Sequence, residues 1–126
     1  MTRINCVRPS ELTDKHLIAE YRELPRIFTL VRRAVERGES INDARNPVEY
    51  VLGAGHCRFF YDKLGYLAFR HNFICFEMEN RGFKNDLYLF WQDYQEDIPI
   101  VWWGDWLPTE AALRLNRARI AERLGN

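Results

Sequence analysis

The sequence predicts an all-α fold, a single compact domain of three main helices joined by long irregular loops. Three segments have apolar residues at helical spacing, and each of them ends at a glycine. No internal repeat or Gly/Ser-rich linker separates them. The chain has 126 residues, 47% of them hydrophobic, which is enough to bury the core of one domain. We therefore expect residues 1–126 to form a single domain.

The first helix is expected from about Thr13 to Arg37, ending at Gly38. Pro25 interrupts this helix because proline has no backbone N–H, so we expect an unpaired carbonyl at Tyr21 and a bend there. The apolar residues recur at helical spacing and form one unbroken stripe. The stripe consists of Leu17, Tyr21, Leu24, Phe28, Val31 and Val35.

The second helix is expected from about Lys63 to Arg81, a segment rich in Leu, Phe and Ile that stops at Gly82. The third follows Pro108 and Thr109 and ends near Gly125. Its expected apolar face consists of Leu113, Ile120 and Leu124. The connection before the second helix contains L-G-A-G-H, whose glycines break any regular element.

The net charge of zero conceals a strong segregation of charge along the chain. Residues 1–37 carry 8 basic and 5 acidic side chains, whereas residues 86–110 carry 6 acidic and no basic ones. Residues 111–126 are basic again, with 4 basic side chains and 1 acidic. This distribution permits nucleic-acid binding, although the total charge does not indicate it.

Several classes of protein are disfavoured by composition. No apolar run approaches the roughly 20 residues of a membrane span, and the N-terminus lacks the pattern of a secretory signal. Cys6, Cys57 and Cys75 are widely spaced and lack a C-x-x-C pattern, which favours a reduced, cytoplasmic setting. With His56 and His71 they match no zinc-binding spacing. We therefore expect no membrane association, no metal and no cofactor.

Five basic residues of the first helix fall within a sector of roughly 60°, because successive residues are about 100° apart. They are Lys15, Arg22, Arg26, Arg33 and Arg37. Such a row is either a solvated surface or an electrostatic footprint for a phosphate backbone. Glu23 borders the row, with His16 and Glu20 one turn before it. Glu23 is therefore either a member of a surface ion pair or, beside the bend at Pro25, the carboxylate of a shaped pocket.

The second residue offers a possible nucleophile. Thr2 is small, so an aminopeptidase can remove Met1 and leave the α-amine of Thr2 at the chain end. An α-amine has a pKa of roughly 7.7–8, against about 10.4 for lysine, so more of it is unprotonated at neutral pH. Such an amine can form an imine with a sugar carbon.

Together, the runs M-T-R-I-N, H-L-I-A-E-Y-R-E-L-P-R, L-G-A-G-H and F-F-Y-D-K-L resemble the pyrimidine-dimer DNA glycosylase/AP lyase family of the phage endonuclease V type. The resemblance covers Met1 to Gly82, resumes at G-D-W-L-P-T-E-A and continues to Leu124. It implies a three-helix DNA repair enzyme that acts as a monomer on cyclobutane pyrimidine dimers in damaged double-stranded DNA. Its setting would be the cytoplasm of a bacterium or of a phage-infected cell.

The resemblance also implies roles for individual residues. The amine of Thr2 would attack C1′ of the 5′ nucleotide of the dimer, and β-elimination from the resulting imine would nick the strand. Glu23 occupies the position of the family's essential carboxylate, and Tyr21 and Arg22 would border a pocket for a flipped base. The implied DNA-binding residues are Arg3, His16, Tyr21, Arg22, Arg26, Arg33, Arg119 and Arg123.

Two departures from the family pattern leave the lesion open. Phage-type members carry an aromatic-rich tail after the third helix and are basic overall, whereas this sequence ends at Asn126 and carries the acidic segment 86–110. Trp102, Trp103 and Trp106 of W-W-G-D-W would either contact the lesion instead or cap the core.

Alternative functions also stay open. They are an AP lyase, a glycosylase for another damaged base, a helical DNA-binding protein without catalysis, and a protein-interaction module that uses the acidic aromatic connection. Retention of Thr2 and Glu23 argues against loss of catalysis, and the interaction module explains none of the N-terminal pattern.

Overall fold

The computed structural model describes residues 2–124, and this part of the chain consists of helices and irregular loops, with no strand and a single isolated β-bridge between Lys63 and Trp103. The all-α prediction is therefore confirmed. None of the helices in residues 2–124 is both long enough and apolar enough to cross a bilayer. The α-helices are α1 (Asp14–Glu23), α2 (Pro25–Glu36), α3 (His56–Phe59), α4 (Leu64–Asn80) and α5 (Glu110–Leu124). Single turns of 3-10 helix are η1 (Pro9–Glu11), η2 (Phe90–Tyr94) and η3 (Ile100–Trp102).

The prediction of a single first helix is wrong, because the chain forms two helices in this region. α1 ends at Glu23 and α2 begins at Pro25, with Leu24 between them in helical conformation. Proline cannot donate to the carbonyl four residues earlier, and its ring crowds that carbonyl, so the helix breaks where a bend was expected. The carbonyl of Tyr21 is nevertheless paired, with His71 of α4.

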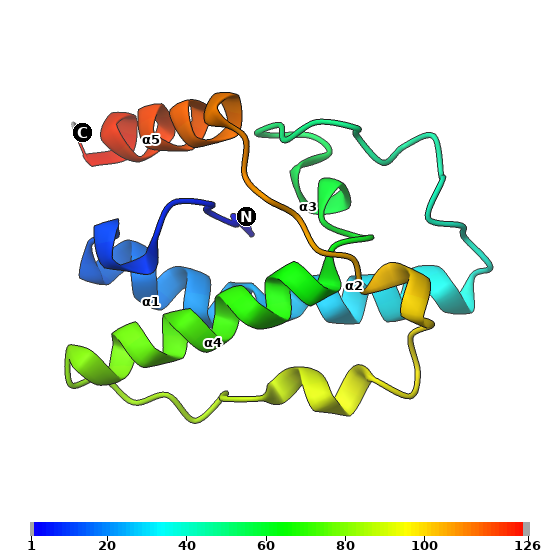
Figure 1. The fold of residues 1–126 in the computed structure, drawn as a ribbon, viewed down its shortest axis with the longest axis horizontal. Coiled ribbons are helices and arrows are strands. Elements are labelled where there is room, and N and C mark those ends of the chain that lie inside the picture. The colour runs from blue at the N-terminus through cyan, green and yellow to red at the C-terminus, as the bar shows by residue number, and fades with distance from the viewer. Residues whose placement is uncertain (1, 125–126) are drawn as a thin grey trace.

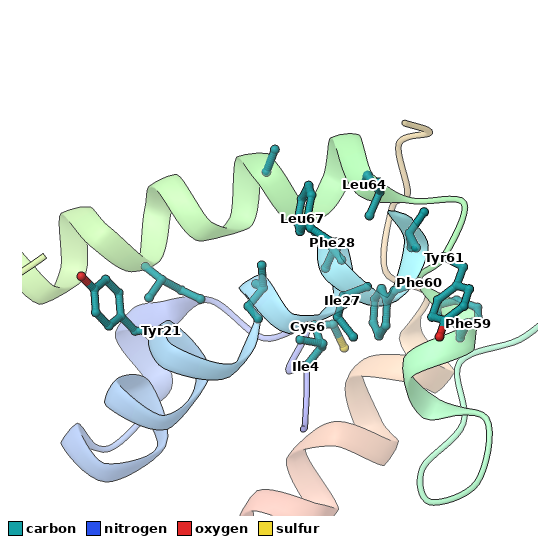
Figure 2. Close-up of a cluster of buried hydrophobic side chains, with 14 of the residues drawn as sticks. Ile4, Cys6, Tyr21, Ile27, Phe28, Phe59, Phe60, Tyr61, Leu64 and Leu67 are labelled. Atoms are coloured by element: carbon teal, nitrogen blue, oxygen red, sulfur yellow. The ribbon is translucent and has the colours of Figure 1, made fainter. Parts of the chain in front are cut away.

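The hydrophobic core lies between α4 and the α1–α2 pair. In Figure 1, α4 runs along both helices, and the N-terminal segment lies between α1 and α5. Figure 2 shows the cluster extending from Tyr21 at one end to Phe59 and Tyr61 at the other. Ile4 belongs to the same cluster, so burial of the N-terminal segment is part of core formation.

The third predicted helix is present as α5, and the expected residues Leu113 and Ile120 are partly buried against the core. Thr109 caps it, its hydroxyl oxygen accepting a hydrogen bond from the Ala112 N–H at 3.0 Å. The buried residues of α5 are Ala112 and Asn116. Leu124, expected on the apolar face, is 56% exposed. The helix is therefore attached by Leu113 and Ile120 and also by a buried small residue and a buried amide, which an apolar pattern does not reveal.

The tryptophans of W-W-G-D-W pack into the domain. Trp102 is buried, and Trp106 packs against Phe59, with ring centroids 5.1 Å apart. Gly104 allows the backbone of this segment to lie close to that of Asp62, because a Cβ at position 104 would lie 2.5 Å from the Asp62 carbonyl oxygen. Its N–H donates to that same oxygen at 3.1 Å. These contacts favour the core-capping interpretation of the tryptophans over contact with a lesion.

Candidate active site

The N-terminal segment is held between α1 and α5 by side-chain amides (Figure 1). The side-chain oxygen of Asn116 accepts hydrogen bonds from the N–H groups of Cys6 and Val7, at 2.7 and 3.1 Å. The Asn116 amide donates to Asn5, and Asn5 donates to Glu20 of α1, each at 2.8 Å. All three polar side chains are buried. A continuous set of hydrogen bonds thus joins the start of the chain to both helices.

Glu20 is fully engaged in a buried ion pair with Arg70 of α4. Two guanidinium nitrogens contact the two carboxylate oxygens, and the third donates to the Val7 carbonyl at 2.7 Å. Burial disfavours a charged Arg70, but the Glu20 carboxylate outweighs it and holds the pKa of Arg70 above its ordinary value. Glu20 is therefore a structural group, which leaves Glu23 as the other carboxylate beside the N-terminal segment.

A cavity of about 520 Å³ opens between the N-terminal segment, α1 and α5. It brings together five residues that the family resemblance implied, from three separate parts of the sequence. These are Arg3, His16, Glu23, Arg119 and Arg123. Lys15, Asn5 and the buried Glu20 also line it. The sequence placed Lys15 in the basic row but did not single it out for the site, and nothing in the pattern marked Asn5.

The cavity is cationic and contains unused hydrogen-bonding nitrogens. Among the described residues, Arg3 Nη1, His16 Nδ1 and Arg119 Nε are buried and have no hydrogen-bond partner. Burial, and then the nearby Arg119 and Arg123, lower the pKa of Arg3. Burial, and then Lys15, Arg123 and Arg3, lower the pKa of His16. Because unpaired buried polar groups are costly, this arrangement suits an anionic ligand such as a DNA phosphate.

Cys57, the residue after His56 at the start of α3, contacts Thr2. The Cys57 thiol lies 3.8 Å from the Thr2 carbonyl oxygen, a weak contact for a sulfur donor. Burial raises the pKa of the Cys57 thiol, and the Glu23 carboxylate raises it further. Glu23 is partly exposed and lies 3.6 Å from Arg26. Thr2 itself does not line the cavity, and Met1 lies outside the described residues.

The structure does not bring the remaining predicted residues to this cavity. Arg22, Arg26 and Arg33 are exposed on α1 and α2 and do not line it. Tyr21 does not line it either. Its ring is buried against His71, and its hydroxyl donates to Asp86 at 2.9 Å. Tyr21 is a core residue, because it belongs to the apolar stripe that faces α4.

The described residues include no group of three or more His, Cys, Asp or Glu side chains placed to hold a metal ion. The cavity instead offers one accessible carboxylate among several cations, next to the start of the chain.

A protein-family model described as pyrimidine dimer DNA glycosylase matches residues 1–90. The matched region contains the N-terminal segment and α1 to α4, and with them Thr2, Arg3, His16 and Glu23. It ends before α5, so it does not bear on Arg119 and Arg123, which the resemblance implied and which line the cavity in the structure.

Proposed function

This chain belongs to the pyrimidine dimer DNA glycosylase family, and from that premise we propose a bifunctional enzyme. It excises bases at ultraviolet-induced cyclobutane pyrimidine dimers in duplex DNA and then nicks the strand as an AP lyase. The observation that carries the proposal is the cavity, which Glu23 and four basic side chains line together, beside the N-terminal segment. In this proposal the enzyme acts as a monomer in the cytoplasm.

The α-amine of Thr2 is the proposed nucleophile, after removal of Met1. Its lone pair bonds to C1′ of the sugar, the C1′–N bond to the base breaks, and the departing base takes up a proton. Loss of the amine proton and opening of the sugar ring give an imine between Thr2 and C1′. Removal of a C2′ proton then expels the 3′ phosphate and breaks the strand. Water hydrolyses the imine and restores the free amine.

Glu23 is the proposed electrostatic and proton-transfer partner of this amine. A carboxylate stabilises the positive charge that develops at the sugar when the base leaves. It also accepts and returns protons during imine formation. The contrast with Glu20 supports this role, because Glu20 is occupied by Arg70 and Asn5, whereas the Glu23 side chain remains 22% exposed.

The phosphates on either side of the lesion are the proposed partners of the basic residues. Arg3 and Arg119 each have a buried nitrogen without a partner, and Arg123 lies on the next turn of α5. Guanidinium groups suit this task because they donate in parallel to phosphate oxygens. Arg22, Arg26 and Arg33, exposed along α1 and α2, extend the basic surface and contact phosphates further along the duplex in this proposal.

The decisive experiment is borohydride trapping on duplex DNA that contains a single abasic site. We expect a covalent complex whose adduct maps to Thr2 by peptide mass spectrometry. Selective acetylation of the α-amine should abolish it. An adduct on Lys15, the amine that lines the same cavity, or undiminished trapping after acetylation would overturn the role of Thr2.

Lesion specificity is tested by comparing cleavage of ultraviolet-irradiated and abasic duplexes by one preparation. Cleavage of both supports the bifunctional pyrimidine-dimer enzyme. Cleavage of the abasic duplex alone would reduce the assignment to an AP lyase, and cleavage of neither would leave a DNA-binding protein without catalysis.

A further inference from the structure

His56 is the residue that fixes the direction of the N-terminal segment. Its Nε2 lies 2.8 Å from the backbone nitrogen of Ile4, and its Nδ1 lies 2.7 Å from the Val51 carbonyl oxygen. A carbonyl oxygen only accepts and a backbone N–H only donates, so Nδ1 carries the proton and Nε2 is the acceptor. These two contacts together require a neutral imidazole in one tautomer.

The position of His56 depends on the local chain geometry. Gly55 precedes it with a φ of 86°, a conformation that L side chains rarely adopt. A Cβ at Gly55 would also lie 2.9 Å from Pro47. The L-G-A-G-H run therefore forms a sharp turn that presents one imidazole edge to the start of the chain.

We propose that His56 is a positioning residue for the reaction: by holding the Ile4 N–H it directs the segment of Thr2 and Arg3 toward Glu23 and the cavity. This inference rests on the proposed role of the Thr2 amine. Ile4 is two residues from Thr2, so the position of Ile4 limits where the amine of Thr2 can lie. The hydroxyl of Tyr50 donates to the Ile4 carbonyl at 3.2 Å, which gives the same residue a second anchor.

The surroundings of His56 keep it neutral. The rings of Tyr50 and Phe60 pack edge-on against the imidazole, with centroids 5.5 and 5.6 Å away. The two charged groups that act on it are Arg3, which opposes a positive imidazole, and Glu20, which favours one. Protonation would place an N–H on Nε2 opposite the N–H of Ile4, so the anchor is lost in acid.

Two substitutions separate positioning from mere support of the fold. In His56→Gln the side-chain oxygen reaches the place of Nε2 and accepts from Ile4. In His56→Asn the amide reaches only the place of Nδ1, so the contact with Val51 persists and the one with Ile4 is lost. Ile98→Ala is the stability control, because Ile98 is buried in the connection after α4, among the core residues, and hydrogen-bonds only within that connection.

The measurement is single-turnover borohydride trapping on abasic duplex DNA at saturating protein, together with the dissociation constant for the same DNA. We expect His56→Asn to slow trapping by about ten- to a hundredfold without weakening DNA binding, as when a reacting group loses its orientation. His56→Gln should recover most of the rate, and Ile98→Ala should retain it. An unchanged rate in His56→Asn, or no recovery in His56→Gln, would overturn the proposal.

A second measurement needs neither activity nor a variant. Nitrogen NMR of the imidazole at neutral pH should find Nδ1 protonated and Nε2 unprotonated, and the Ile4 amide should be protected from exchange until His56 is protonated. The opposite tautomer or an unprotected Ile4 amide would overturn the positioning role. Failure of the unsubstituted protein to trap DNA would instead overturn the proposed function and leave this result standing.

Discussion

The imidazole Nε2 of His71 lies 2.9 Å from the carbonyl oxygen of Tyr21, although 50 residues separate them in the sequence. Tyr21 is the residue whose carbonyl Pro25 cannot pair, because proline has no N–H to donate four residues back. His71 therefore supplies from α4 the hydrogen bond that the broken helix lacks. A tertiary contact thus pairs the carbonyl left open by the break between α1 and α2, next to the helix end that carries Glu23.

A double-mutant cycle tests this relationship. His71→Leu should destabilise the protein by about 1–3 kcal/mol, the cost of a buried acceptor left without a partner. In a Pro25→Ala background the loss should be smaller, because the backbone N–H at position 25 can pair with the Tyr21 carbonyl. The free energy of unfolding in urea gives both values. Equal losses in the two backgrounds would contradict the coupling.

The buried pair of Glu20 and Arg70 should matter far more than an exposed pair. Arg70→Met should cost about 3–5 kcal/mol, because it leaves the Glu20 carboxylate buried without its counter-charge. Arg117→Met is the matched control, since Arg117 contacts Glu11 on the surface and should change stability little. Denaturant unfolding of the two variants provides the comparison, and similar losses would contradict the structural role of Glu20.

Stability should fall as the pH drops below about 6.5, the ordinary pKa of histidine. Burial lowers the pKa of both His56 and His71 in the folded protein, so the unfolded chain binds protons at a higher pH than the folded one. The stability contributed by the two neutral histidines is therefore fully present above pH 6.5. It decreases as the pH falls from 6.5 through the lowered pKa values of the folded protein. Thermal unfolding between pH 7.5 and 5 measures this, and substituting glutamine for both histidines should make the profile shallower, leaving the contribution of His16, whose pKa burial also lowers.

Glu23→Gln should separate binding from chemistry. The substitution removes the carboxylate but keeps the size and polarity of the side chain, so duplex binding should be retained. Strand cleavage should fall by about a hundredfold or more, the range typical for loss of a positioned acid–base group. Gel-based cleavage and binding assays on one duplex give both quantities. Near wild-type nicking would remove Glu23 from the mechanism.

The basic residues of α5 should contribute to the salt dependence of DNA binding. Arg119→Gln should weaken binding and reduce the slope of log K against log salt by about 0.9, the share of one phosphate. Arg114→Gln is the control on the same helix, because Arg114 is exposed and does not line the cavity. Fluorescence anisotropy over a salt series measures the slopes, and an equal reduction in both variants would contradict the assignment of Arg119.

The sequence predicted α4 and α5 well because both have strong end signals. α4 spans Leu64–Asn80 against an expected 63–81, and α5 begins directly after the predicted Thr109. The first helix was predicted with the right residues but as one element, because periodicity continues across Pro25 and only the proline marks the break. The predicted apolar face of α5 was partly wrong. Asn116 also attaches this helix to the N-terminal segment, and a polar amide does not appear in a pattern of apolar residues.

The sequence by itself determined the helical class, the position of the break and, through long motifs, the family and the candidate roles of Thr2 and Glu23. These are local or linear properties, set by spacing, caps and residue type. Only the tertiary structure decided which of two neighbouring glutamates is accessible, which arginines share the cavity, and that Tyr21 belongs to the core. The reason is physical: burial, ion pairing and the direction of an anchored segment depend on contacts between residues far apart in the chain, such as Glu20 with Arg70 and Ile4 with His56.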